Sequence, residues 1–315
     1  MTVETIHLQV MNKKILIVGA NGFTGRHLLY AFAKKPDWQV TGCSLHPDIC
    51  PPAHGYRFLE TDITNEAELK KRMEEVQPDV VVHTAALSAT DYAETHPAEA
   101  EAVNVNAVAS LATLCAQYGS RLIHLSTDFV FGGDTCRLYT EEDTPSPVNY
   151  YGHTKWESEK VVASICRNYA IARIVVVYGA PYPGQHGNIV SLVIQRLRNH
   201  QEIRVADDQW RTPTYVGDVV QGIEKLVAQP VCGIYHLCGG ECMTVADMAL
   251  RTADTLGLDR SLILPVHTAA MQEKTPRPRF SGLSIEKARR DLGYRPHTFE
   301  EGIRRMQLDD SSRRK

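Results

Sequence analysis

The sequence predicts an α/β fold in which helices cover both faces of a parallel sheet. Short apolar runs alternate with longer helical patterns, many of these runs are rich in valine and isoleucine, and a glycine-rich turn follows the first of them. Near-continuous Val/Ile/Leu runs are typical of parallel strands, which are buried on both faces. A length of 315 residues with 43% hydrophobic residues suits one large domain, or a domain with a smaller lobe.

Strands and helices alternate through the first half of the chain. Strands are expected at 14–18, 39–44, 57–60, 80–84, 121–126 and 172–178. Helices are expected at 24–34, 66–76, 98–118 and 151–168, with Gly119 at the position of a helix C-cap glycine. This alternation predicts a doubly wound parallel sheet.

The alternation changes after Tyr178, where prolines and a glycine form a loop. Helices are expected at 188–199, 216–228 and 244–256, a short strand at 234–237, and a last helix between an N-cap at Ser284 and Gly293. We expect residues 12–178 to form the main domain. Residues 179–315 should mainly form a smaller C-terminal α/β lobe over the carboxyl edge of the sheet, with about 214–237 returning to the main domain.

Composition excludes several classes of protein. The formal charge is −3 and the basic residues are scattered, so no nucleic-acid partner is expected. No apolar run reaches the roughly 20 residues of a membrane span, and residues 1–12 do not resemble a signal peptide. The eight cysteines form no Cys-x-x-Cys pair, which favours reduced thiols and a cytoplasmic protein. The thirteen histidines show no metal-ligand spacing, so no metal site is expected.

The glycine-rich turn is the first feature that indicates chemistry. Gly19-Ala20-Asn21-Gly22-Phe23-Thr24-Gly25 follows the apolar run 15–18 and opens a helix. Such glycines make the tight turn, allow the backbone to approach a pyrophosphate, and let helix and strand pack closely. The N-terminus of the helix then offers N–H groups and partial positive charge to the phosphates. The sequence therefore predicts a Rossmann-type domain that binds a dinucleotide.

The end of the second strand bears on which dinucleotide is bound. A carboxylate there would accept hydrogen bonds from the ribose 2′-hydroxyl of NAD. This strand instead ends without one, and Ser44 or His46 could contact a 2′-phosphate. NADP(H) is therefore favoured and NAD(H) remains possible. Asp62, after the third strand, could bind the adenine amino group or lie in a solvated turn.

A second motif, Tyr151-Gly152-His153-Thr154-Lys155, opens the helix that follows Thr127. The i,i+4 spacing places Tyr151 and Lys155 on one helical face. A nearby ammonium would lower the pKa of the tyrosine, which could then protonate a carbonyl oxygen while Thr127 holds that oxygen. The spacing alone is weak evidence, because Tyr30 and Lys34 share it without a preceding Ser/Thr strand end.

These motifs together resemble the extended short-chain dehydrogenases/reductases, and most closely the dTDP-4-dehydrorhamnose reductase family. The similarity covers nearly the whole chain and rests on Gly19–Gly25, 78–86, Asp91 with Glu94, 104–106, 126–131, Tyr151 to Lys155, 211–215, 276–278 and 281–283. The resemblance implies a nucleotide-linked 4-keto sugar as substrate, a role in dTDP-rhamnose biosynthesis, and a homodimer formed through the helices 98–118 and 151–168.

The resemblance also implies roles for particular residues. The catalytic residues would be Thr127, Tyr151 and Lys155. The cofactor would contact Gly19, Asn21, Gly22, Phe23, Thr24, Gly25, Ser44, Asp62, Ile63, Ala85, Ala86, Tyr151 and Lys155. The substrate would contact Thr127, Asp128, Asn188, Arg211 and Arg277, and arginine suits bidentate contact with phosphate.

Departures from the family pattern leave alternatives open. Phe129 replaces the glutamate that follows the Thr-Asp pair in sugar dehydratases, which disfavours water elimination. Val176 occupies a position at which the family often has a tryptophan, which weakens the assignment of a dTDP-deoxyhexose. A nucleotide-sugar epimerase is one alternative. A non-catalytic NADP-binding regulatory subunit, resembling the beta subunit of methionine adenosyltransferase, is the other.

Overall fold

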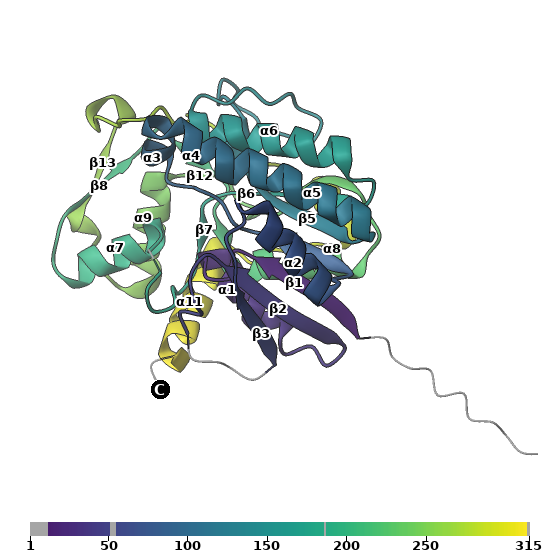
Figure 1. The fold of residues 1–315 in the computed structure, drawn as a ribbon. Helices are drawn as coiled ribbons and strands as arrows, with labels where there is room; N and C mark the ends of the chain where they lie inside the picture. Colours follow the sequence, from purple (N-terminus) through teal and green to yellow (C-terminus); the bar gives the residue numbers. More distant parts are fainter. Residues whose placement is uncertain (1–11, 51–54, 186, 314–315) are drawn as a thin grey trace, which may run out of the picture.

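The computed structural model describes residues 12–50, 55–185 and 187–313, and its centre is a seven-stranded parallel sheet (Figure 1). The strand order is β11-β6-β5-β4-β1-β2-β3. The strands are β1 (Lys13–Val18), β2 (Trp38–Ser44), β3 (Tyr56–Glu60), β4 (Val80–His83), β5 (Arg121–Thr127), β6 (Tyr169–Ile174) and β11 (Gly233–His236). The order reverses between β1 and β4, and ligands of such sheets bind at the carboxyl ends beside this reversal. The predicted doubly wound α/β fold is confirmed.

Helices cover both faces of this sheet because each strand alternates its side chains between two apolar cores. Ile15 and Ile17 of β1 belong to the core under α1 (Phe23–Phe32) and α8 (Val216–Ala228). Leu16 and Val18 belong to the core under α2 (Glu66–Val76), α5 (Ala107–Tyr118) and α6 (Tyr150–Ile165). Figure 1 shows α2, α5 and α6 together on the second face. The β1–α1 turn lies at the carboxyl edge of the sheet, beside its central strands.

The helix expected at 98–118 is interrupted. It consists of α4 (Pro97–Glu101), a π-helical turn η1 (Ala102–Asn106) and α5, and a short helix α3 (Thr90–Thr95) precedes it. In η1 the buried side chain of Asn104 accepts a hydrogen bond from the Leu87 N–H at 2.8 Å and donates to Thr154 Oγ1 at 3.0 Å. The long-range partners of Asn104 thus explain why the helix departs from regular α geometry.

The strand expected at 172–178 is two strands. β6 ends at Ile174, and β7 (Val177–Tyr178) leaves the main sheet to pair with β10 (Thr214–Tyr215). Between them Val176 has φ of 36°, which is a strained conformation for a β-branched residue. The prediction of one continuous strand was therefore wrong, because a continuous apolar run does not reveal where a chain changes sheets.

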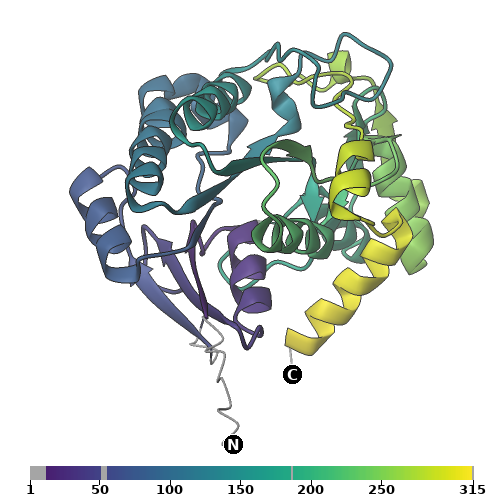
Figure 2. The ribbon, with the colours of Figure 1, turned by 90° about the vertical axis from the view of Figure 1, so that its right-hand side faces the viewer.

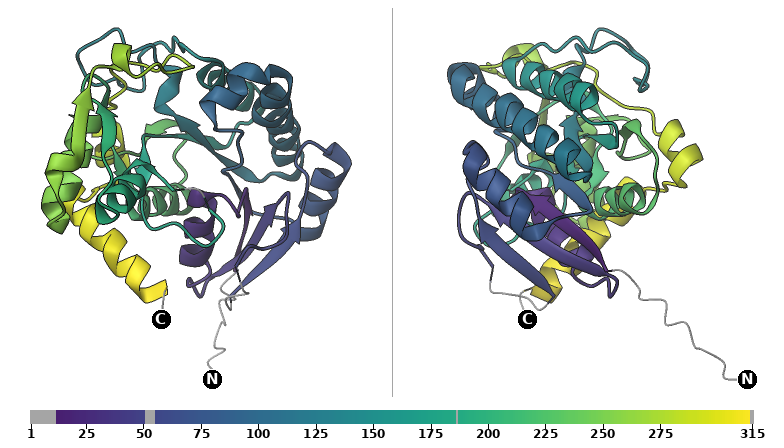
Figure 3. Two further views of the ribbon diagram at one scale, coloured as in Figure 1. Left: turned by 90° about the vertical axis from the view of Figure 1, so that its left-hand side faces the viewer. Right: turned by 45° about the vertical axis from the view of Figure 1, so that its right-hand side comes forward.

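The second half of the chain forms a smaller lobe beside the carboxyl edge of the sheet (Figures 2 and 3). Its remaining elements are α7 (Ile189–Arg198), β8 (Ile203–Ala206), β9 (Trp210–Arg211), β12 (Met243–Thr244), α9 (Val245–Leu256), β13 (Ile263–Val266), α10 (Glu286–Leu292) and α11 (Phe299–Arg313). Short 3-10 turns are η2 (Asp128–Val130), η3 (Arg260–Leu262) and η4 (Thr268–Ala270). The domain boundaries remain a prediction, although α8 and β11 do lie in the layers of the main sheet.

The expectation for the C-terminal helices needs correction. The N-cap of α10 is Ile285 rather than Ser284, and α10 is followed by α11, which no sequence pattern led us to expect. Phe299, Ile303 and Met306 of α11 pack against the smaller lobe with helical spacing. Among the described residues, no helix combines the length and apolar character that would let it cross a membrane.

Candidate active site

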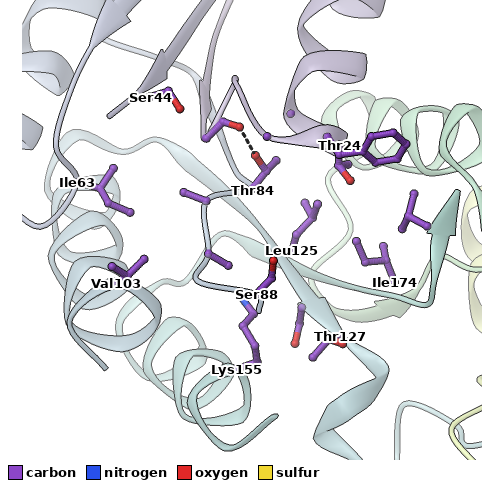
Figure 4. Close-up of a pocket in the computed structure, with 18 of the residues that line it drawn as sticks. Thr24, Ser44, Ile63, Thr84, Ser88, Val103, Leu125, Thr127, Lys155 and Ile174 are labelled. Carbon is purple, nitrogen blue, oxygen red and sulfur yellow. Dashed lines mark hydrogen bonds between the residues drawn. The ribbon is translucent and has the colours of Figure 1, made fainter. Parts of the chain in front are cut away.

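A cavity of about 550 Å³ opens at the carboxyl edge of the central sheet, where the strand order reverses (Figure 4). Its wall is built by the β1–α1 turn, the ends of β2 to β5, the π-helical turn η1, the start of α6, and the segment 174–177. This volume lies within the range of small-molecule and cofactor sites, roughly 300–1,000 Å³. Segments distant in sequence therefore meet where the fold is expected to bind a ligand.

The glycine-rich turn has the geometry of a phosphate cradle. Gly19 has φ of +86°, and a Cβ on it would lie 2.5 Å from the Ala85 nitrogen. A Cβ on Gly25 would lie 2.2 Å from the Gly19 oxygen. Gly22, the N-cap of α1, provides no side-chain cap, and no acidic residue lies in the first turn. The N–H groups at the start of α1 are therefore available to an anion in the cavity, so these residues fit a dinucleotide pyrophosphate.

The neighbouring loop after β4 fixes this turn. Thr84 Oγ1 lies 2.9 Å from the Val18 oxygen and 3.1 Å from the Gly19 oxygen, and a dashed line in Figure 4 marks a hydrogen bond of Thr84. Ala85 and Ala86, both expected at the cofactor, follow directly and line the cavity. Small side chains at these two positions leave room beside the turn.

Most of the expected cofactor residues line the cavity, and Asn21 does not. The lining residues are Gly19, Gly22, Phe23, Thr24, Gly25, Ser44, Asp62, Ile63, Ala85, Ala86, Tyr151 and Lys155. The Asn21 side-chain amide donates to the His46 and Pro47 oxygens at 3.0 and 2.8 Å, and its Oδ1 accepts from Arg26 at 2.6 Å. Asn21 therefore holds the loop that follows β2 beside the cavity.

The proposed catalytic residues share one wall of the cavity. Thr127 ends β5, and Tyr151 and Lys155 project from the first turns of α6. Asn149 caps α6 by accepting a hydrogen bond from the Gly152 N–H at 2.8 Å. A Cβ on Gly152 would lie 2.1 Å from the Phe129 oxygen, so α6 packs unusually closely on the turn after β5. This close packing brings the three side chains together, and Figure 4 shows Thr127 and Lys155 at the same end of the cavity.

The electrostatics of Tyr151 differ from our expectation. Burial and the nearby Asp128 carboxylate raise the pKa of Tyr151, and a hydrogen bond with Thr127 opposes them. Lys155, expected to lower this pKa, instead places its Nζ 3.1 Å from His124 Nε2. Burial lowers the pKa of Lys155 to about 8, with Glu159 acting against that shift. The phenol in this conformation is therefore a proton donor that keeps its proton at neutral pH.

The expected substrate residues are not gathered in one place. Asp128 lines the cavity and accepts a hydrogen bond from the hydroxyl of Ser281, which ties the smaller lobe to the end of β5. Arg211 is buried, with its Nε 3.8 Å from Asp128, and its Nη2 donates to the Pro278 oxygen at 2.8 Å. Asn188 caps α7 through the Ser191 N–H at 3.0 Å. These contacts give Arg211 and Asn188 structural partners within the smaller lobe.

Arg277 lies on the outside of that lobe, 3.6 Å from Glu273, and 39% of its side chain is exposed. Neither Arg277 nor Asn188 nor Arg211 lines the cavity. Several lining residues lie outside the quoted motifs and were missed: Leu45, Thr61, Thr64, Ser88, Val103, Ile174 and Val177. Most lie beside a predicted strand end, so the rule that ligands bind there could have found them.

A dinucleotide cradle and a Thr/Tyr/Lys set at the carboxyl edge of this sheet define an extended short-chain dehydrogenase/reductase. Residues 13–311 match the family model of the RmlD substrate binding domain, and the chain belongs to this family. The dTDP-4-dehydrorhamnose reductase of Bacillus anthracis, solved in complex with NADP, superposes with a TM-score of 0.82 and 26% identity. The superposition covers 95% of this chain and 100% of that one.

Other similar proteins are of two kinds: a subunit of methionine adenosyltransferase, and enzymes that act in glycan or nucleotide-sugar chemistry. The methionine adenosyltransferase 2 subunit beta of Bos taurus is 33% identical over 264 residues, which is 82% of this chain and 77% of that protein. A probable low-salt glycan biosynthesis reductase of Haloferax volcanii is 29% identical over 290 residues, covering 91% of this chain and 95% of that one. The UDP-glucose 4-epimerase of Thermotoga maritima has a TM-score of 0.82 at 22% identity, which shows the fold alone.

Proposed function

We propose that this protein is an NAD(P)H-dependent reductase of a nucleotide-linked 4-keto sugar. The observation that carries the proposal is that Thr127, Tyr151 and Lys155 line the same cavity as the glycine cradle. The solved dTDP-4-dehydrorhamnose reductases support it, since one of them holds NADP in this fold at 26% identity. A homodimer and a place in dTDP-rhamnose biosynthesis are further expectations of the same resemblance, and a cytoplasmic location is expected from the cysteine pattern.

The side chains of the cavity have distinct roles in this reaction. The nicotinamide cofactor, when bound, supplies the hydride that reduces the carbonyl carbon. Tyr151 donates its phenolic proton to the carbonyl oxygen, and its raised pKa keeps that proton in place until the oxygen becomes basic. Thr127 donates a hydrogen bond to the same oxygen. The Lys155 ammonium, whose Nζ faces His124 in this structure, supplies the positive charge on this wall that favours the phenolate left on Tyr151.

The preference for NADP(H) over NAD(H) can be tested by a substitution at Ser44. It lines the cavity at the end of β2. An aspartate there would repel a 2′-phosphate and accept a hydrogen bond from a 2′-hydroxyl. Ser44→Asp is therefore expected to raise KM for NADPH about tenfold, equivalent to about 1.4 kcal/mol, and to leave KM for NADH equal or lower. Steady-state kinetics with both cofactors measures this, and an unchanged KM ratio would contradict the assignment.

Reduction is favoured over elimination by the surroundings of Tyr151. Phe129 stands where the resembled dehydratases carry a glutamate, and its ring lies 6.1 Å from that of Tyr151. The Arg211 guanidinium lies over the Phe129 ring, 5.8 Å from its centroid. An aromatic ring cannot move the proton that water elimination requires. An epimerase would differ from a reductase in keeping its cofactor bound and consuming no NADPH.

A regulatory subunit is the second candidate, and the 33% identity with methionine adenosyltransferase 2 subunit beta favours it. The resemblance to that subunit implies an NADP-binding protein that does not turn the cofactor over. The complete Thr127, Tyr151 and Lys155 set on the cavity wall weighs against a purely regulatory role.

The proposal is tested by following NADPH oxidation against a panel of nucleotide-linked 4-keto sugars, with product analysis by mass spectrometry. We expect oxidation with at least one of them and one new alcohol per NADPH consumed. Interconversion of sugars without NADPH loss would identify an epimerase. Stoichiometric co-purification of a methionine adenosyltransferase, together with no oxidation on any sugar, would favour the regulatory subunit.

A further inference from the structure

A buried line of titratable side chains leads from Lys155 into the centre of the sheet. Lys155 Nζ lies 3.1 Å from His124 Nε2, and His124 Nδ1 lies 3.0 Å from His83 Nδ1. The two imidazole rings are stacked with centroids 5.1 Å apart and planes 12° apart. They are neighbours because β4 and β5 pair His83 with His124 in register. Packing alone would not require both nitrogens of His124 to face polar partners.

The protonation states in this line follow from burial and charge. Burial and the Lys155 ammonium lower the pKa of His83 to about 3. The same causes, with His83 in addition, hold the pKa of His124 well below its ordinary value. Both histidines are therefore neutral at neutral pH, and each carries a single ring proton.

The directions of the hydrogen bonds then fix the tautomers. An ammonium group can only donate, so His124 Nε2 accepts from Lys155 and the His124 proton is on Nδ1. That N–H donates to His83 Nδ1, which leaves the His83 proton on Nε2, a buried atom without a hydrogen-bond partner among the described residues. Ser158 Oγ also lies 2.9 Å from His124 Nε2 and 2.7 Å from the Lys155 oxygen. With Nε2 as an acceptor, the Ser158 hydroxyl donates to it and shares its single hydrogen with the Lys155 oxygen.

We propose that His124 is a positioning residue for Lys155, and that His83 selects the tautomer in which His124 can accept the lysine's hydrogen bond. The inference rests on the proposed function in that Lys155 is taken as catalytic. A buried N–H without an acceptor is unfavourable, so the unpartnered His83 Nε2 is a cost of this arrangement. This cost is offset because the Lys155 ammonium has a hydrogen-bond acceptor, His124 Nε2, in a site where burial disfavours its positive charge.

Other charged and titratable groups lie on α6 and on the elements packed around it, where their charge can also influence the pKa of Lys155. They are Glu159 and Tyr151 on α6 itself, Asp128 on η2, Arg173 on β6, Glu94 on α3 and Glu101 on α4. Glu159 raises the pKa of Lys155, but its two oxygens are held by Arg173 at 2.9 and 2.7 Å. Glu94 accepts from the Tyr150 N–H. His124 is thus the acceptor placed directly on Nζ.

The test is an NMR titration of Lys155 in protein labelled with ¹³Cε-lysine, with and without NADPH, the resonance being assigned through Lys155→Arg. In the free wild-type protein we expect a midpoint at about pH 8. His124→Leu should lower it by about one to two pH units, the shift equivalent to a charge-assisted hydrogen bond. His124→Gln, whose amide oxygen can reach the same place, should restore most of that shift. His27→Leu removes another buried histidine, on α1, and should leave the midpoint unchanged.

Equal midpoints for His124→Leu and His27→Leu would overturn the proposal, as would a ¹⁵N spectrum placing the His124 proton on Nε2. If His124→Leu fails to fold, His83→Phe takes its place, because it removes the acceptor for Nδ1–H and should also lower the Lys155 midpoint. The alkaline limb of kcat should follow the midpoint in each variant. Absence of turnover by the wild-type protein would count against the reductase and leave the titration as an independent result.

Discussion

Tyr151→Phe is expected to lower kcat for sugar reduction by about 10²- to 10⁴-fold, the usual contribution of a positioned general acid. The substitution removes the phenolic oxygen and retains the ring, which packs beside Phe129 at 6.1 Å. Binding of the cofactor should change much less than kcat, because the cradle for its pyrophosphate lies on a different element of the cavity. Single-turnover kinetics and calorimetric titration with NADPH measure the two effects separately.

Tyr30→Phe is the matched control, because Tyr30 and Lys34 repeat the same spacing on α1. Tyr30 does not line the cavity and stacks on Tyr182 at 5.1 Å. Its loss should leave kcat unchanged. Full turnover by Tyr151→Phe would show that another group protonates the carbonyl oxygen.

Gly25→Ala is expected to weaken cofactor binding by about 10- to 100-fold, the effect of overpacking by about 1–3 kcal/mol. The new Cβ would lie 2.2 Å from the Gly19 oxygen and 2.8 Å from Thr84 Oγ1. Both atoms belong to the turn or to its support, so neither can yield without displacing the N–H groups at the start of α1. Calorimetric titration measures the affinity, and urea unfolding measures the accompanying loss of stability.

Gly119→Ala separates this clash from general effects of losing a glycine. Gly119 has φ of +71° at the C-cap of α5, and a Cβ there would meet nothing within 4 Å. It should cost stability through backbone strain, of the order of 1 kcal/mol, and leave cofactor affinity unchanged. Equal affinities of the two variants would mean that the cradle does not hold the pyrophosphate.

Local signals in the sequence were sufficient for the main sheet. The Val/Ile/Leu runs that predicted β1, β4 and β5 are buried on both faces, and the glycine turn does open α1. Gly119 caps α5 in the left-handed conformation as predicted. These features depend on residues close together in the chain, because strand burial, helix capping and tight turns are short-range properties.

Features set by distant contacts could not be predicted in this way. Val176 turns the chain out of the main sheet so that β7 pairs with β10, and η1 is π-helical where Asn104 bonds to Leu87 and Thr154. Asn188 bonds to Ser191 and Arg211 to Pro278, and no sequence pattern predicted these contacts within the smaller lobe. Residue type alone does not tell whether a polar group faces a ligand or a neighbouring segment.

The sequence by itself determined the doubly wound sheet, the dinucleotide turn and the helix that carries Tyr151 and Lys155. The tertiary structure decided what surrounds them: Asp128 beside the tyrosine, and His124 and His83 behind the lysine. The physical reason is the register of parallel strands, which joins residues 41 positions apart in the chain and buries them together. Burial and such neighbours set the protonation states of the site, and no local pattern of residues records them.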